Sequence, residues 1–296
     1  MGLPLILRQM RSILRAVPVG ICLKLRKGNI VKIRKSTHPP DGRGAFTLIE
    51  LLVVISIICL LMAIALPSLT RARGQGERIA CLANMKNFTY GWIMYSHDHG
   101  DKLCSADTDW DVPPASHWVA DGPFMPANDV GGTADAIAAG TLWPYTEKTL
   151  DLYRCHSDLS DMLRSYAISR AMNGKTCNCE HDNIKPFRTF GEITMPSERM
   201  VFVDAASRMA WIEGSYCQVE QIDAIPPKWY VRDSRNITAR HRGGCNLSFA
   251  DASCGYWKFR DPRTLDLANW EMGPDDASQD NPDLDRMVQL LQGRRE

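Results

Sequence analysis

The sequence lacks the short motifs that identify several classes of enzyme. It contains no Gly-x-Ser-x-Gly nucleophile elbow, no Gly-rich phosphate-binding loop and no His-Glu-x-x-His pair. It also has no internal repeat and no low-complexity linker. Hydrophobic residues make up 45% of the chain and charged residues 23%, as in globular proteins. These absences argue against a hydrolase and favour a non-enzymatic protein.

Acidic residues are nearly missing from residues 1–45. This segment carries ten Lys or Arg and one acid, Asp41, a net charge of about +9, whereas the whole chain is +1. Residues 46–296 therefore carry about −8. Positive flanks of a membrane span stay cytoplasmic, so residues 1–45 read as a cytoplasmic leader. No nucleic-acid fold signature accompanies this charge, so it does not predict a nucleic-acid partner.

A 21-residue apolar segment follows the leader, from Phe46 to Leu66. Only Thr47, Ser56 and one acid, Glu50, interrupt it. A helix of about 20 residues crosses the hydrocarbon core of a bilayer, so we expect a transmembrane helix over residues 46–67. A carboxylate inside such a helix is costly without a partner, which makes Glu50 a candidate functional residue.

The sequence of residues 46–50, the apolar run and Pro67 together resemble the processing motif of type IV prepilins and type II secretion pseudopilins. The resemblance implies that a prepilin peptidase cuts between Ala45 and Phe46, after Gly44, and that Phe46 is N-methylated. Ala45 replaces the Gly that usually precedes the cut. It also implies a role for Glu50 in assembly with other pilin or pseudopilin subunits. The leader is long for this family, so either the start lies downstream or the basic stretch lies on the inner membrane surface.

The resemblance further implies a single-pass inner-membrane protein with a cytoplasmic N-terminus and a periplasmic or pilus-borne C-terminal domain. The residue pattern predicts that the helix continues as an amphipathic stretch over residues 68–100. Apolar residues there recur at three- and four-residue steps: Leu69, Ile79, Leu82, Met85, Phe88, Trp92 and Ile93. We expect this stripe to pack on the outer domain, with a kink at Pro67 and an end at Gly100.

Residues 101–262 read as a loop-rich β ectodomain, and residues 263–296 as an acidic tail that we expect to be mobile apart from a short helix at residues 284–291. Strands are expected at residues 200–204, at Trp211-Ile212 and in a hairpin over residues 245–259, with Asp251-Ala252 as its turn. The predicted fold class is α+β: a long N-terminal helix packed on a small antiparallel sheet, as in pilins.

The ectodomain carries a second resemblance. His241, nine residues and then Asp251 are similar to the prepilin-type processing-associated family defined by His, nine residues and Asp-Gly. Further matches follow at residues 81–86, 153–158 and 165–167. Ala252 departs from the Gly of that motif, and His156 from its usual Pro. His241 and Asp251 could form an acid–base pair, but a strand between them spans roughly 20 Å, so we expect each to stabilise a different loop.

Ten cysteines are many for a cytosolic protein, and an even number falls outside the leader and the span. We expect disulfides in an oxidising compartment among Cys81, Cys104, Cys155, Cys177, Cys179, Cys217, Cys245 and Cys254. Cys245 and Cys254 are not expected to pair with each other, because the hairpin register places them about 13 Å apart.

Two segments carry residue types that bind metal ions. Cys177, Cys179 and His181 offer zinc ligands but lack Cys-x2-Cys spacing and a second ligand pair. The carboxylates of residues 97–101 could bind calcium, although a polar helix end explains them as well. We therefore predict no resident metal or cofactor, with calcium kept as an alternative.

The sequence leaves two functions open. The first is a pseudopilin or minor pilin subunit. The alternative is a membrane-anchored surface protein that binds a glycan or another ligand through Trp110, Trp118 and Trp143, and uses prepilin processing only for sorting.

Overall fold

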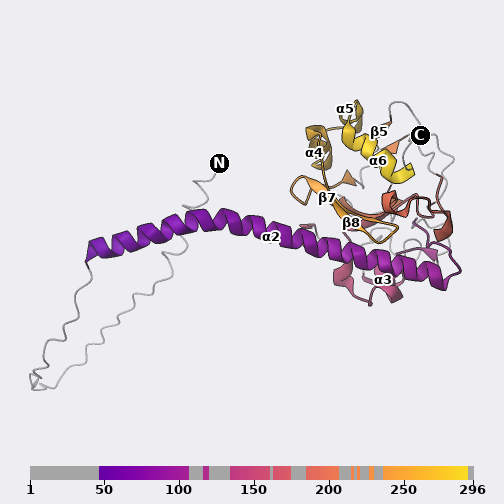
Figure 1. Ribbon diagram of the computed structural model, residues 1–296, viewed down its shortest axis with the longest axis horizontal. Coiled ribbons are helices and arrows are strands. Elements are labelled where there is room, and N and C mark those ends of the chain that lie inside the picture. Colours follow the sequence, from indigo (N-terminus) through magenta and orange to yellow (C-terminus); the bar gives the residue numbers. More distant parts are fainter. Residues whose placement is uncertain are drawn as a thin grey trace, which may run out of the picture. The chain divides into compact units, whose positions relative to one another are not determined.

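The computed structural model describes residues 47–106, 116–119, 134–160, 163–174, 185–206, 215–216, 219–220, 227–229 and 236–292. The chain is an α+β protein: a long N-terminal helix, a small antiparallel sheet and further short helices (Figure 1). This confirms the predicted fold class. The predicted strand at Trp211-Ile212 lies outside the described residues.

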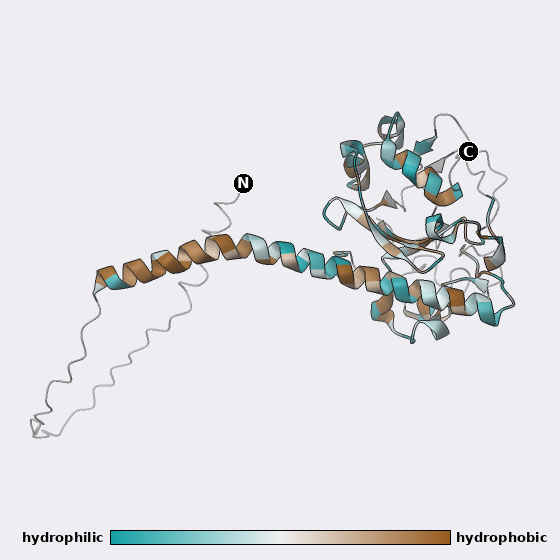
Figure 2. Ribbon diagram, in the orientation of Figure 1, coloured by the Kyte–Doolittle hydropathy of each residue, from teal (hydrophilic) through white to brown (hydrophobic). Residues whose placement is uncertain are grey.

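The first described element is α2 (Leu48–Asp98), a helix of 51 residues that runs through Pro67. Its apolar part is exposed around its whole circumference, from Leu48 to Leu66, and it is long and apolar enough to span a membrane. Figure 2 shows that the hydrophobic residues crowd the N-terminal half of α2 and become intermixed with polar residues further along. The helix ends before Gly100, which takes the predicted left-handed conformation at φ +65°.

The amphipathic stripe of α2 packs from Cys81 onward. Met85, Phe88 and Trp92 are fully buried, as predicted, whereas Leu69 and Ile79 are 66% and 61% exposed. The expectation that the stripe begins at residue 69 is therefore wrong. In this part of the helix the contacts with the ectodomain are made by other residues, since Glu77 accepts a hydrogen bond from Ser157 and Arg78 lies over the ring of Tyr256.

The main sheet is built on four antiparallel strands in the order β1 (Tyr166–Ser169), β2 (Met200–Ala206), β7 (Gly244–Phe249) and β8 (Cys254–Lys258). Strand β3 (Ser215–Tyr216) joins β1 in parallel, and β6 (Asn236–Ile237) pairs with the end of β2. A separate pair consists of β4 (Val219–Glu220) and β5 (Lys228–Trp229). The predicted strands at residues 200–204 and 245–259 are confirmed.

Both faces of the sheet are covered. On one face lies the C-terminal half of α2, with Phe88 against Phe202 of β2. On the other face lie α4 (Pro262–Ala268), α5 (Pro274–Ser278) and α6 (Pro282–Gln292) (Figure 1). The first five residues of β7 are therefore all buried, although the alternation of Leu247 and Phe249 with polar residues is typical of a strand with one buried face.

The C-terminal helices also correct the prediction of a mobile acidic tail. Leu284, Met287 and Leu291 of α6 are at most 1% exposed and share a core with Leu247 and Trp257 of the hairpin. The acids that suggested a mobile segment cap and orient these helices instead: Asp261 accepts a hydrogen bond from the Arg263 amide at the start of α4. The helix predicted at residues 284–291 is confirmed within α6.

Short elements complete the domain. They are α3 (Ala134–Ala138) and the 3-10 helices η2 (Trp143–Tyr145), η3 (Leu150–Tyr153), η4 (Phe190–Glu192) and η5 (Pro196–Glu198). Gly244 starts β7 where the Trp257 carbonyl of β8 approaches so closely that a Cβ atom would collide with it. Gly243, directly before β7, has φ +83°, so glycine suits both positions of this pair.

Candidate functional site

The first candidate site is the start of α2. Thr47 precedes the helix, and its amide and hydroxyl both donate to Glu50 Oε2 at 2.8 Å, while the Glu50 amide donates to Thr47 Oγ1 at 3.2 Å. This is a capping box, in which a Thr and a Glu three residues later satisfy the free amides of the first helical turn. The cleavage-site residues Gly44, Ala45 and Phe46 lie outside the described residues.

Glu50 is thus the local acceptor that fixes the first turn of an otherwise apolar helix. A carboxylate has two oxygens with about four lone-pair positions, so these bonds to Thr47 leave room for a further donor. The position of Glu50 in the apolar segment predicted an assembly role, but its bond to Thr47 was not predicted. The Thr-x-x-Glu spacing was the available signal.

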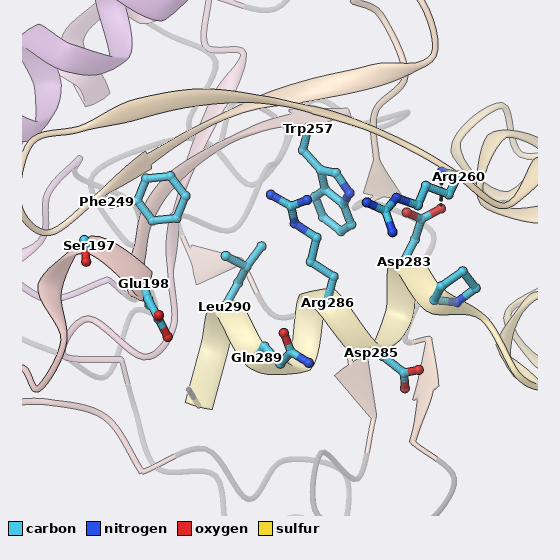
Figure 3. Close-up of a pocket in the computed structure, with 11 residues that line it drawn as sticks. Ser197, Glu198, Phe249, Trp257, Arg260, Asp283, Asp285, Arg286, Gln289 and Leu290 are labelled. Carbon is cyan, nitrogen blue, oxygen red and sulfur yellow. Dashed lines mark hydrogen bonds between the residues drawn. The ribbon is translucent and has the colours of Figure 1, made fainter. Parts of the chain in front are cut away.

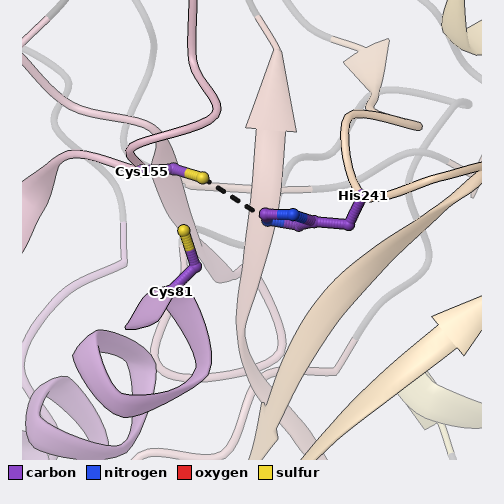
Figure 4. A group of neighbouring side chains, drawn as sticks. All are labelled: Cys81, Cys155 and His241. Carbon is purple, nitrogen blue, oxygen red and sulfur yellow. Dashed lines mark hydrogen bonds between the residues drawn. The ribbon is translucent and has the colours of Figure 1, made fainter. Parts of the chain in front are cut away.

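The second candidate site is a buried cluster in the ectodomain, which we call the thiol–imidazole cluster: Cys81, Cys155, His241 and Asp204. Cys81 projects from α2, Cys155 follows η3, His241 precedes β7, and Asp204 lies on β2. The two sulfurs and a ring nitrogen of His241 all lie within 4.8 Å of one another (Figure 4). Three segments far apart in sequence therefore meet at one point.

The distances within the cluster centre on His241 Nε2. It lies 3.4 Å from Cys155 Sγ and 3.3 Å from Asp204 Oδ2. Asp204 Oδ2 also accepts a hydrogen bond of 2.8 Å from the Asn246 amide, whereas Asp204 Oδ1 is buried without a hydrogen-bond partner. Neighbouring Arg240 pairs with Asp158 at 3.1 Å. The cluster is closed, because none of its four residues is more than 2% exposed.

The cluster stabilises a negative charge on Cys81 and a positive charge on His241, but it disfavours a negative charge on Cys155. The Cys155 thiol donates a hydrogen bond that outweighs burial and, together with His241 and Tyr166, lowers the pKa of Cys81 to about 5. The same contact, with burial, raises the pKa of Cys155. Burial opposes a charge on His241, but its bonds to Asp204 and Cys81 and their negative charges raise its pKa to about 9. The cluster can therefore hold a thiolate beside an imidazolium.

The cluster has the residue types of a cysteine-dependent enzyme, yet its burial argues against that chemistry. A nucleophilic sulfur must reach a substrate, and both sulfurs are fully buried. What the arrangement can do without rearrangement is bind a cation that prefers sulfur and nitrogen ligands, or join its two thiols in a disulfide.

The structure places the two residues of the predicted family motif in different surroundings. Asp251 lies in the turn of the β7–β8 hairpin and accepts from the Ser253 amide and hydroxyl at 2.9 and 2.6 Å. His241 lies in the buried cluster. The geometry agrees with the expectation that the two do not bond to each other. The His241 amide donates to the Gly244 carbonyl at 3.2 Å, whereas its ring contacts Asp204 and Cys155.

The hairpin turn also differs in detail from the prediction. Ser248, not Phe249, faces Cys254, so the loop runs over four residues, 250–253, and not over two. Ala252 nevertheless takes the left-handed conformation, at φ +64°. Cys245 faces Trp257, three positions from the rung of Cys254, so these two cysteines remain too far apart to pair.

Disulfides were predicted among eight cysteines. Every cysteine that the structure describes is a free thiol: Cys59, Cys81, Cys104, Cys155, Cys245 and Cys254. Cys177, Cys179 and Cys217 lie outside the described residues, as does the zinc alternative at residues 177–181. Sequence spacing alone could not bring Cys81, Cys155 and His241 together, but each falls in a separately recognised family motif, and that was the signal missed.

The predicted calcium and ligand residues have other partners. Asp98 accepts a hydrogen bond from Tyr145, and Asp101 accepts one from the Gly191 amide, so residues 97–101 act as a polar helix end.

Trp118 is fully buried and Trp143 is partly buried, while Trp110 lies outside the described residues. Trp118 is therefore a core residue and not a surface ligand contact.

A surface pocket of about 480 Å³ lies between the hairpin, η5 and α6 (Figure 3). The Arg286 guanidinium lies over the ring of Trp257 at 5.3 Å, and Arg260 borders the same space. Asp283 is engaged with the amides of Arg260 and Asp261, so it caps the loop and does not face the pocket as a free acid. Two guanidiniums and an indole favour a planar, negatively charged group, but Glu198 and Asp285 also line the pocket and oppose a negative charge there.

Comparison with known proteins identifies the N-terminal region. Residues 41–66 match the model of the prokaryotic N-terminal methylation motif. With its long apolar helix, this region of the chain is pilin-like. No curated protein and no solved structure matches the chain.

Proposed function

We propose that this chain is a membrane-anchored pseudopilin or minor pilin subunit. In this proposal a prepilin peptidase removes the basic leader, and the mature protein joins a type II secretion pseudopilus or a type IV pilus-like structure. The observation that carries it is the methylation motif at residues 41–66, which includes the exposed apolar start of α2 from Leu48 onward. A role as a subunit also fits the buried thiol–imidazole cluster, which offers no access to a substrate.

Cleavage after Ala45 would create an α-amine at Phe46, which is largely protonated near neutral pH since its reference pKa is about 7.7–8.0. A cation in the bilayer needs an anion. Glu50 of a neighbouring subunit would supply it while keeping its bonds to its own Thr47. The stagger between Phe46 of one subunit and Glu50 of the next would then set the assembly register.

The charge distribution predicts how the chain is oriented across the inner membrane. The leader carries about +9 and the rest of the chain about −8, so we propose a cytoplasmic leader and an ectodomain on the opposite side of the inner membrane.

The test compares Glu50→Val with Thr47→Val in cells that express the export or pilus system. Glu50→Val is expected to insert into the membrane at the parental level and to be absent from cross-linked or sheared filaments. Thr47→Val removes the cap but keeps the acid, so it should still assemble. Normal assembly of Glu50→Val would refute the proposed role of this residue.

The alternative is a surface protein that uses prepilin processing only for sorting. The pocket bordered by Arg260, Arg286 and Trp257 is the observation that favours it, now that Trp118 is excluded as a surface contact. Saturable binding of an anionic glycan that Arg286→Ala abolishes, in a chain that never enters a filament, would establish this alternative.

A further inference from the structure

The thiol–imidazole cluster has a ligand set that the assembly role does not use. We propose that Cys81, Cys155 and His241 bind a zinc ion, with the carboxylate of Asp204 as the fourth ligand. The inference does not depend on the proposed function, because it concerns only the folded ectodomain.

The chemistry of the donors selects the metal. Thiolate and imidazole are zinc ligands, and a closed site with four protein ligands is the arrangement of structural zinc. Hard cations such as calcium require six or more oxygens, and this cluster offers the oxygens of one carboxylate. Burial of all four side chains, none above 2% exposed, fits a structural site and not an open catalytic one.

Two ligand-to-ligand distances from His241 Nε2 agree with the edges of a zinc tetrahedron. Ligand bonds of about 2.0–2.3 Å at tetrahedral angles give edges of about 3.3 Å from nitrogen to oxygen and about 3.6 Å from nitrogen to sulfur. The measured edges are 3.3 Å to Asp204 Oδ2 and 3.4 Å to Cys155 Sγ. The first is long for a charged hydrogen bond, which usually measures about 2.7–2.9 Å. Cys81 belongs to the same group, since its sulfur lies within 4.8 Å of Cys155 Sγ and of a ring nitrogen of His241.

The second observation is the carboxylate itself. Asp204 Oδ1 is buried with no hydrogen-bond partner, although its other oxygen is held by the Asn246 amide. A buried, unsatisfied carboxylate oxygen is costly, so this carboxylate has acceptor capacity that the Asn246 amide and His241, both bound to Oδ2, do not use. The Asn246 amide would act as the outer partner that orients a ligating carboxylate.

A disulfide between Cys81 and Cys155 is the competing use of the two sulfurs. It would account for neither His241 nor Asp204, which would stay buried beside it as an ion pair without a further role. Zinc uses all four residues. It would also join α2 to β2 and to the segments before β7 and after η3, so binding would be coupled to folding of the ectodomain.

The test uses the full-length chain, purified in detergent without chelator. We expect about one zinc per chain by plasma mass spectrometry. Replacement by cobalt should give a thiolate-to-cobalt charge-transfer band and the visible bands of a tetrahedral site. Cys81→Ser, Cys155→Ser and His241→Gln are expected to lose the metal, and Asp204→Asn to bind zinc at least about tenfold more weakly.

Two controls locate the metal. Cys254→Ser removes a free thiol outside the cluster and should keep full occupancy. Cys177→Ser tests the other cysteine-rich segment and should keep it as well. Loss of zinc in Cys177→Ser with retention in Cys81→Ser would overturn the assignment.

Measurements on the unmodified chain do not depend on whether the variants fold. Zinc should protect two thiols from alkylation and raise the melting temperature of the chelator-treated protein, whereas calcium should do neither. A Cys81–Cys155 disulfide in the isolated chain, or a cobalt spectrum without thiolate bands, would refute the proposal.

Discussion

The two halves of helix α2 share one secondary structure and meet two different environments. Residues 48–66 expose apolar side chains in every direction, whereas from Cys81 to Ser96 one stripe is buried against the sheet and the remaining side chains are largely exposed. Ile57 and Ile79 are 53% and 61% exposed, so exposure alone does not distinguish them. Their neighbours do, since Ile57 is surrounded by apolar residues and Ile79 by Arg78 and Gln75. Whether a helix segment lies in lipid or in water is therefore predicted from the residues all around the helix and not from single positions.

Phe88 gives the largest expected effect and tests the buried half. Its ring packs on Trp118, Tyr153, Tyr166 and Phe202. Phe88→Ala should lower the free energy of unfolding of the ectodomain by about 3–5 kcal/mol because it leaves a cavity among these rings. Denaturant titration of the full chain in detergent measures it.

Met94→Ala is the matched control, since Met94 lies on the same part of α2 and is 55% exposed. It should change the free energy of unfolding by no more than about 0.5 kcal/mol. Equal effects of the two substitutions would show that the helix does not pack as described.

A charge placed in each half separates membrane from water. Ile57→Arg should oppose membrane insertion by about 2.5–3.5 kcal/mol, because Ile57 lies near the middle of the apolar segment. Ile79→Arg, at similar exposure, should leave insertion unchanged. Fractionation of cells after carbonate extraction measures both, and equal membrane retention of the two variants would contradict the assignment of the anchor.

A smaller difference in unfolding free energy is expected between two threonines, one in each half of α2. Thr70 and Thr89 each donate to the carbonyl four residues earlier, but Thr89 also donates to Ser248 Oγ at 2.7 Å. Ser248 in turn accepts from the Phe202 amide at 3.1 Å. Thr89→Val should cost about 1–3 kcal/mol of unfolding free energy, because it leaves buried polar groups with fewer partners. Thr70→Val should lower the free energy of unfolding by less than about 0.5 kcal/mol. Thermal unfolding of both variants measures the difference.

The sequence predicted what depends on local pattern. The apolar run before Pro67, the strand at residues 200–204 and the hairpin around Asp251 were all found where their periodicity indicated. The packing of the C-terminal residues was not predictable in this way, since Asp283 and its neighbours in residues 263–296 looked like a solvated acidic tail. Their carboxylates instead accept backbone amides at loop and helix starts, and this leaves Leu284 and Met287 free to cover the sheet.

The thiol–imidazole cluster could not be predicted because its residues are 74 and 86 positions apart, at Cys81, Cys155 and His241. No spacing rule for metal sites covers such intervals, and only the folding of α2 onto the sheet brings the side chains together. Each residue had been recognised separately in a family motif. The three residues lie in different motifs of one family, and this suggested that they are close in space, whereas their spacing did not.

The central claim is that the chain is processed as a prepilin at the start of α2. Its most direct test is mass spectrometry of the N-terminal peptide of the membrane-extracted protein, from cells with and without active prepilin peptidase. The account predicts a mature chain that begins at Phe46 and carries one methyl group on its α-amine, and an intact leader only where the peptidase is inactive. An intact leader, or an unmethylated terminus at another residue, in cells with active peptidase would contradict it.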